Sequence, residues 1–288
     1  MSRESQPNLP TELEEVIFSL CLHNDWNNAR SLFLVAKRVY QWLGPQLYAV
    51  AIFHPDKFEG RRPKYTTQSL IQHGQYVRHL LLSNSDSIDQ TGLCDPVEDC
   101  ISWCPNLRNV ALWTIESRFE ILKNEFHRLA GLPYLAHLSI DLDALCMVIK
   151  DDTSKKSIPI FPNVTHLELL QGEQLLKPQM IENSFPAITH LSLDGLTSPS
   201  RTDLIEVALR HWGDRLQVVI WFLGTSGTNC LPEVISTSAY ISHHDPRVVI
   251  LTYGDHYAKT WYEGTQGGMG MWRTADEAVR KRRQAASS

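Results

Sequence analysis

The sequence has few cysteines and no long apolar run. Its 288 residues include 6 cysteines, too few for the disulfide framework that holds small secreted domains together. The longest apolar runs, such as residues 218–223, are far shorter than the roughly 20 residues of a membrane-spanning helix. Residues 1–8 are polar and lack the apolar stretch of a signal peptide. We therefore expect an intracellular protein, cytoplasmic or nuclear, with reduced thiols and no membrane partner.

The sequence also lacks an excess of basic residues and any recognisable catalytic motif. Acidic residues outnumber basic ones by 32 to 27, which gives a net charge of -5 and argues against nucleic acid as a partner. The glycines of residues 264–270 lack the spacing of a phosphate-binding loop. Cys94, Cys100 and Cys104 lack the Cys-x-x-Cys pair of a zinc site, and the last two fit one face of a helix that begins near Pro96. We therefore expect no enzymatic activity, no cofactor and no bound metal.

A repeat occupies the middle of the chain. Residues 104–112, 132–140, 161–169 and 185–193 all read as an apolar residue or Cys, then Pro, any residue, and apolar-x-x-apolar-x-apolar. Three weaker copies place their first apolar residue at Val77, Leu216 and Val248. Over all seven copies, this position falls at 77, 107, 135, 164, 188, 216 and 248, with a mean spacing of 28.5 residues.

Each copy predicts a short strand with one buried face, because its apolar residues alternate at the end of the motif. Between copies, segments such as 119–129 and 204–212 have the spacing of amphipathic helices. This pattern resembles the leucine-rich-repeat family, which implies an irregular solenoid of stacked strand–helix units with a curved parallel sheet on its concave side. An ordinary α/β domain also alternates parallel strands with helices, but it does not predict the recurring proline.

Residues 9–53 have a different pattern, which indicates helices. Leu13, Val16, Ile17 and Leu20 lie at i, i+3, i+4 and i+7. A second helical run extends from 32 to 43, and Gly44-Pro45 is expected to stop it. A short third element covers residues 47–52.

The motif within these helices resembles the F-box family. It consists of Leu9-Pro10-Thr11-Glu12-Leu13, then Val16-Ile17, then residues 34–39 and Trp42. The resemblance implies a three-helix unit that packs on a Skp-family adaptor protein. The residues expected to bind this partner are Leu9, Pro10, Leu13, Ile17, Val35 and Trp42. Alternatively, these residues cover the open end of the solenoid, which needs a cap.

A column of histidines is predicted on the concave face. The residue before the second apolar position of each copy should point out of the sheet, and these residues are His79, Asn109, His137, His166, His190, Val218 and Ile250. One hypothesis is that the column binds an acidic target segment or a metal. The other is a neutral hydrogen-bonding ladder that helps to hold the register, because neighbouring imidazoles resist double protonation.

The same positions become apolar in the last copies, at Val218, Ile220 and Ile250. An exposed apolar patch usually marks an interaction surface. We expect it either to bind the target or to be covered by the C-terminal segment, whose residues 275–286 predict a short charged helix.

These observations predict an α/β protein in three parts: an F-box-like helical unit over residues 1–53, a leucine-rich-repeat solenoid over 54–254, and a glycine-rich loop with a helix over 255–288. The combined resemblance implies a substrate-recognition adaptor of a cullin–RING (SCF-type) ubiquitin ligase, which bridges a Skp-family adaptor and an unknown protein target. The alternative is a repeat scaffold that binds proteins without any link to ubiquitination.

Overall fold

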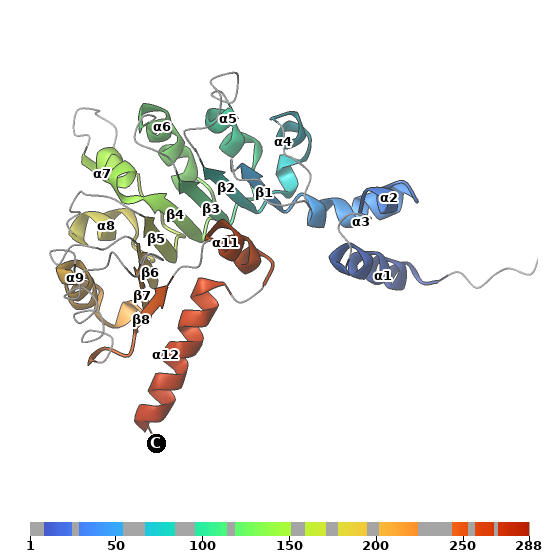
Figure 1. The fold of residues 1–288 in the computed structure, drawn as a ribbon. Helices are drawn as coiled ribbons and strands as arrows, with labels where there is room; N and C mark the ends of the chain where they lie inside the picture. Colours follow the sequence, from blue (N-terminus) through green and yellow to red (C-terminus); the bar gives the residue numbers. More distant parts are fainter. Residues whose placement is uncertain are drawn as a thin grey trace, which may run out of the picture.

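The computed structural model describes residues 9–24, 29–53, 67–83, 96–113, 119–150, 159–170, 178–194, 202–223, 244–252, 257–267 and 270–287. These residues form one eight-stranded sheet in which every pairing is parallel and the strands follow one another in sequence order (Figure 1). The strands are β1 (Val50–Phe53), β2 (His79–Ser83), β3 (Asn109–Trp113), β4 (His137–Asp141), β5 (His166–Leu170), β6 (His190–Leu193), β7 (Val218–Leu223) and β8 (Val248–Thr252). The predicted α/β class with a parallel sheet is confirmed.

A row of helices covers one face of this sheet, which we call the outer face (Figure 1). They are α4 (Thr67–His73), α5 (Pro96–Trp103), α6 (Phe119–Ala130), α7 (Leu142–Lys150), α8 (Pro178–Ser184) and α9 (Thr202–Trp212), with short 3-10 turns at Gly74–Tyr76 and Gly213–Arg215. The repeated apolar positions of the strands, such as Val77, Leu80 and Leu82, are buried against them in one continuous core. Stacking therefore supplies the core that a single strand–helix unit lacks.

Side chains in the turns before the strands tie consecutive repeats together. In three repeats, the residue before the first apolar position donates a hydrogen bond to a backbone carbonyl in the preceding turn. The bonds are Asn106 Nδ2 to Gln75 O (2.8 Å), Asn163 Nδ2 to Pro133 O (3.0 Å) and Arg215 Nη1 to Pro186 O (3.1 Å). They satisfy turn carbonyls that the strand ladder leaves unpaired.

The N-terminal helices are α1 (Thr11–Asn24), α2 (Ala29–Phe33) and α3 (Lys37–Leu47), and they enclose a small core of their own around Leu22, Val39 and Leu43. The expected stop at Gly44-Pro45 is wrong, because α3 continues through Pro45 to Leu47. A proline in the last turn removes only one helical hydrogen bond, and the continued helix buries Leu47.

The third N-terminal element is a strand of the sheet. Residues 50–53 form β1, which pairs with β2 from Val50↔His79 to Phe53↔Leu82. The sheet therefore begins inside the region that the sequence assigned to the helical unit, and the repeat architecture has one strand more than the seven predicted copies.

The C-terminal helices α11 (Tyr257–Thr265) and α12 (Met271–Ser287) lie on the opposite face of the sheet, which we call the inner face (Figure 1). The charged helix predicted over residues 275–286 is confirmed and begins earlier. Gly264 belongs to α11, although the sequence placed it in a loop. A Cβ on Gly270 would come within 2.7 Å of the Gly264 Cα, so glycine permits the close crossing of the two helices. None of the helices in the described ranges is long and apolar enough to cross a membrane.

Candidate functional site

Two faces of α1 carry apolar side chains, and one of them packs against α3. Phe18 and Leu22 contribute to the core of the helical unit. Two polar contacts join α1 and α3 at the edges of this core. They are an ion pair between Arg38 and Glu14 (2.8 Å) and a hydrogen bond from Gln46 Nε2 to Ser19 Oγ (2.9 Å). These contacts fix which face of α1 points away from α3.

The other face of α1 presents large apolar side chains to solvent. Leu13 is 52% exposed, Ile17 47% and Leu20 58%. The turn between α2 and α3 adds Leu34 and Val35, of which Leu34 is 87% exposed. We call the exposed set Leu9, Pro10, Leu13, Val16, Ile17 and Leu20 the α1 surface. Exposed apolar residues concentrated in this way are typical of an interaction surface.

Five of the six residues predicted to bind a partner are exposed. The exception is Trp42, which is half-buried in the core of the helical unit, with its ring 6.4 Å from that of Phe18 and 5.9 Å from the Arg38 guanidinium. Sequence reasoning did not single out Val16, Leu20 and Leu34 as partner residues, although the first two lie on the same helical stripe. Because the α1 surface faces solvent, it does not cover the end of the sheet.

The predicted histidine column lies in one register on the inner face. Strand pairing aligns His79, Asn109, His137, His166, His190 and Val218. Three of the rings stack: the His137 and His166 centroids lie 4.0 Å apart, as do those of His166 and His190, and both pairs are inclined by only 12°. Asn109 separates His79 from this stack.

Threonines immediately before two of these histidines bind their rings. Thr165 Oγ1 lies 2.9 Å from His166 Nδ1, and Thr189 Oγ1 lies 2.7 Å from His190 Nδ1. His190 Nε2 contacts Asp276 Oδ1 of α12 at 3.1 Å. A neutral His190 that donates from Nε2 to this carboxylate must accept from Thr189 at Nδ1.

Burial keeps most of the column uncharged. It lowers the pKa of His79 and of His137 to about 4, with a smaller contribution from neighbouring cations and imidazoles. The pKa of His166, between two imidazoles, falls to about 2, again chiefly through burial. Parallel stacked rings cannot converge on one ion, and no three His, Cys, Asp or Glu side chains among the described residues could hold a metal. The geometry thus favours the neutral ladder.

A second row on the inner face contains an acid, Glu168, whose burial the sequence did not predict. Ala111, Ser139, Glu168, Ser192 and Ile220 share one register. Burial raises the pKa of Glu168 to about 8, so its side chain is a carboxylic acid at neutral pH. It hydrogen-bonds to Ser139, whose Oγ accepts a hydrogen bond from Trp113 Nε1 at 3.0 Å.

The C-terminal helices cover both ends of the inner face. Trp261 of α11 packs on Leu81 and Ala111, and Ala275 and Val279 of α12 pack on β7 and β8. Between them, the edge of the Trp272 ring meets His166 and His190 at 5.1 and 5.8 Å.

This cover settles the role of the predicted apolar patch. Val218 is 1% exposed and Ile220 0%. The expectation that they form a target-binding surface is wrong, because α12 occupies the space in front of them. The alternative expectation, a cover formed by the C-terminal segment, is confirmed.

Ile250 does not belong to this patch. β8 aligns Val248 with Val219 and Ile250 with Trp221. The sequence motif had instead aligned Val248 with Leu216, three residues before Val219. Ile250 therefore shares the register of the outer-face core residue Trp221, and Val249 packs under α12 instead.

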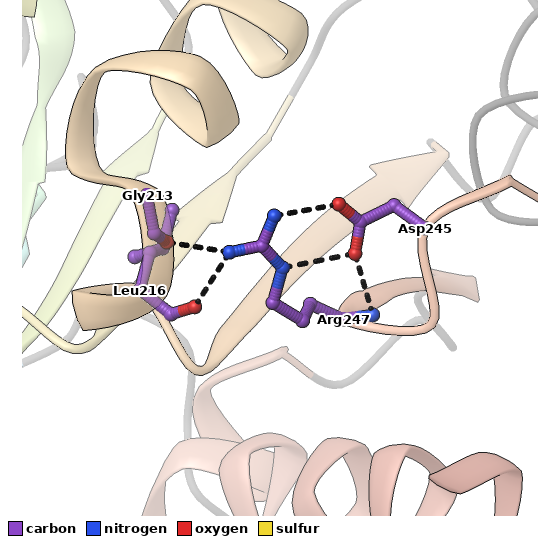
Figure 2. Close-up of polar contacts among 4 residues, drawn as sticks. All are labelled: Gly213, Leu216, Asp245 and Arg247. Carbon is purple, nitrogen blue, oxygen red and sulfur yellow. Dashed lines mark hydrogen bonds and ion pairs between the residues drawn. The ribbon is translucent and has the colours of Figure 1, made fainter.

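A polar clamp explains the shifted register (Figure 2). The Arg247 guanidinium donates to both carboxylate oxygens of Asp245, at 3.0 and 2.7 Å, and to the carbonyls of Gly213 and Leu216. It thereby joins the turn before β8 to the turn before β7. In the other repeats, a buried apolar residue occupies the first position of the motif. In this last repeat, the hydrogen bonds of Arg247 hold the turn instead.

No group of three or more His, Cys, Asp or Glu side chains in the described ranges could hold a metal ion, and Cys21, Cys100, Cys104 and Cys146 form no disulfide there. The two features that distinguish this chain are the α1 surface and the covered inner face. No protein-family model matches the chain, and no curated protein matches it either.

Proposed function

We propose that this protein is a substrate-recognition adaptor of an SCF-type ubiquitin ligase. On this proposal, α1–α3 act as an F-box-like unit that binds a Skp-family adaptor, and the strand–helix repeats act as a leucine-rich-repeat solenoid that holds a protein target. The protein performs no chemistry of its own and works by bringing two partners together.

The observation that carries the proposal is the exposure of the α1 surface. The residues of the F-box-like motif could have packed against the sheet or against α3, yet Leu13, Val16 and Ile17 all point to solvent. A helix that presents apolar residues at i, i+3 and i+4 suits a hydrophobic groove on a partner protein. The opposite face of the helix is held by α3, so the surface is presented in a fixed orientation.

The sheet supports the second half of the proposal. Eight parallel strands follow one another without any change of order, and their turns repeat the same carbonyl contacts. An open stack built in this way has an extended surface that is suited to protein recognition. Because α11 and α12 occupy the inner face, we assign target recognition to the strand ends and their turns.

Co-purification of the full chain with a Skp-family adaptor tests the first half. Ile17→Asp places a charge on the α1 surface, and we expect it to weaken binding by at least 100-fold. Ile160→Asp is the matched control, because Ile160 is also about half exposed but lies in a turn of the repeats. Leu9→Ala combined with Pro10→Ala should also abolish co-purification.

Equal binding by the Ile17 and Ile160 variants would refute the role of the α1 surface. If the unmodified chain captures no Skp-family adaptor, the proposal fails and the repeat scaffold without a link to ubiquitination takes its place.

A further inference from the structure

A groove runs along one side of α12, where this helix passes the start of β7. Its volume is about 490 Å³, which is within the range of ligand-binding sites in proteins. Its polar lining includes Asp276, Arg280, Arg283 and Gln284, on one stripe of α12, and Gln217, just before β7. The groove therefore lies at the strand ends and turns to which we assign target recognition.

The base of the groove is apolar. Val218 and Val279 line it, and both are buried because α12 packs on β7 at this point. The groove thus follows the edge of the cover that α12 forms over the inner face. Burial of a charge against apolar side chains is unfavourable, so a charged group of a ligand has to lie beside the polar wall.

The charged residues of the groove follow a fixed order along α12. Asp276, whose Oδ1 contacts His190 Nε2, lies at one end. Arg280 and Arg283 follow about one and two helical turns later. At a rise of 1.5 Å per residue, Asp276 and Arg283 lie about 10 Å apart along the helix axis, a distance that about three residues of an extended peptide cover.

The contacts of Arg280 hold its guanidinium on this side of the helix. Its Nη1 donates to Gln284 Oε1 at 3.4 Å, and its Nη2 lies 3.8 Å from Glu277 Oε1. This ion pair is exposed to solvent, with 59% of the Arg280 side chain accessible, and such pairs contribute little to stability. Arg280 can therefore exchange it for a ligand. Arg283 is three residues further along, a spacing at which helical side chains are neighbours.

We propose that the groove binds the free carboxyl terminus of a protein target, with Arg280 and Arg283 on the terminal carboxylate. Asp276 and the two arginines together carry one negative and two positive charges. A single carboxylate balances this excess, whereas a phosphate monoester, at about -1.5 to -2, exceeds it. Guanidinium groups bind carboxylates through paired hydrogen bonds, and capture of a chain terminus is a recurring mode of peptide recognition.

The remaining polar groups suit the residues that precede the terminus. Backbone N–H groups of the peptide can donate to the Asp276 carboxylate, and the amides of Gln217 and Gln284 can donate and accept. The last side chain lies over the apolar base, so we expect it to be uncharged. The role of the bound protein as a target for ubiquitination rests on the proposed function, but the groove itself does not.

Peptide binding to the full chain tests the groove. The probes are pools of eight-residue peptides with fluorescein at the amino terminus, degenerate internal positions and a fixed last residue, either leucine or aspartate. The leucine pool is made with a free carboxyl terminus and with a terminal amide, and the readout is fluorescence anisotropy. We expect saturable binding of the free-carboxylate leucine pool, at least tenfold tighter than its amide, because the amide offers no charge to the arginines. The aspartate pool should bind more weakly, because it places a second charge near the apolar base.

The double variant Arg280→Gln, Arg283→Gln should weaken binding of the free-carboxylate leucine pool at least tenfold, to the level of the amide. The control is Arg210→Gln combined with Lys281→Gln, which removes the same charge and should change binding less than twofold. Lys281 pairs with Glu277, as Arg280 does, but lies outside the lining of the groove, and Arg210 is exposed on α9. Matching thermal unfolding of the two double variants would establish that both are folded.

Four results would overturn the proposal: equal binding of the carboxylate and amide forms, equal or tighter binding of the aspartate pool, a preference for the carboxylate that persists in the Arg280, Arg283 variant, or the same loss in both double variants. Adaptor binding distinguishes this failure from failure of the proposed function. The Arg280, Arg283 variant should still co-purify with a Skp-family adaptor, because the α1 surface is intact. A chain that binds the free-carboxylate pool but no adaptor would support the groove and refute the ligase role.

Discussion

Arg247 shows how one side chain can hold a repeat in place. Its guanidinium bonds to Asp245 and to two carbonyls of the preceding turn (Figure 2), and the ion pair is mostly buried. Removing the Arg247 guanidinium would leave the Asp245 carboxylate without its cation and both backbone carbonyls without their hydrogen-bond donor.

We therefore expect Arg247→Met to lower the free energy of unfolding by about 3 kcal/mol, measured by chemical denaturation. Arg215→Met is the control, because Arg215 bonds to Glu182 and Pro186 from a more exposed position and should cost about 1 kcal/mol or less. Equal losses in the two variants would show that the clamp contributes no more than an ordinary surface pair.

The inner-face histidines and Glu168 should give the protein a stability maximum near pH 6.5. Unfolded imidazoles titrate near this pH, while the folded pKa values of His79 and His137 are about 4 and that of His166 about 2. Below pH 6.5 the unfolded chain takes up protons that the folded chain excludes, so stability falls as the pH falls. Each histidine contributes a slope of about 1.4 kcal/mol per pH unit.

Glu168 acts in the opposite direction, because its folded pKa of about 8 lies above its ordinary value of 4.5. Its contribution is complete below pH 4.5 and is lost as the pH rises to 8. Between pH 6.5 and 8 only this loss remains among the four groups, and it amounts to about 2 kcal/mol.

Denaturation of Glu168→Gln at pH 6.5 and 8 isolates this loss. The variant should have nearly the same stability at both values, whereas the unmodified protein and the exposed-site control Glu263→Gln should be less stable at pH 8. A Glu168→Gln protein that declines as steeply as the control would contradict a protonated Glu168.

At the residue scale, periodicity could predict the histidine column because the strands obey the repeat. It failed at Ile250, where the Arg247 clamp replaces an apolar position and shifts the register of β8 by three residues. Periodicity also did not indicate that Glu168 is buried. A single acidic residue in a strand gives no sign of burial until the helices that cover it are placed.

At the scale of elements, α12 is the part whose position the sequence left open. Its charged sequence predicts a helix. Only the packing of Ala275 and Val279 reveals that one side of this helix covers the inner face of the sheet. The helix α11 was not predicted, since Gly264 and the glycines that follow it suggested a loop. Similarly, Pro45 suggested a helix end at a position where burial of Leu47 favours one more turn.

Deleting α12 should therefore uncover an apolar surface. Truncation after Gly270 exposes Val218, Ile220 and Val249, and we expect a loss of about 5 kcal/mol in stability, estimated from the burial of several apolar side chains. Increased fluorescence of the dye ANS would report the exposed surface. Truncation after Arg283 serves as the control, because residues 284–287 are exposed, and equal dye binding by the two truncated chains would argue against the cover.

At the scale of the whole molecule, the spacing of the repeats predicted the order of seven strands before any contact was known, because one residue pattern implies one structural unit. The repeat spacing did not predict the number of strands or the way in which the N-terminal helices attach to the sheet. The residues leading into β1 also read Pro-x-apolar-x-x-apolar-x-apolar, from Pro45 to Ile52, but the structure aligns Ala51 and Phe53, one residue later than this motif, with Leu80 and Leu82. The joint between helices and sheet includes the stacking of Tyr48 on His73, whose rings lie 3.9 Å apart. Contacts of this kind leave no periodic trace.

This joint suggests that the helical unit opens independently of the sheet. Among the described residues of this unit, four are buried in its separate core, Leu22, Val39, Leu43 and Leu47, whereas the core of the sheet runs from Ala51 in β1 to Val248 in β8. Segments with few buried contacts open at lower free energy than the rest of a protein.

Hydrogen exchange measured by mass spectrometry on the full chain tests this arrangement. We expect amides of α1 to exchange at least 100-fold faster than those of β3–β6. Tyr48→Ala should speed exchange in α1–α3 and leave β3–β6 unchanged, and a bound Skp-family adaptor should slow exchange in α1 alone. If α1 exchanges as slowly as the central strands, or if Tyr48→Ala accelerates both regions equally, the helices and the sheet form one cooperative unit and the partner-binding surface is as rigid as the core.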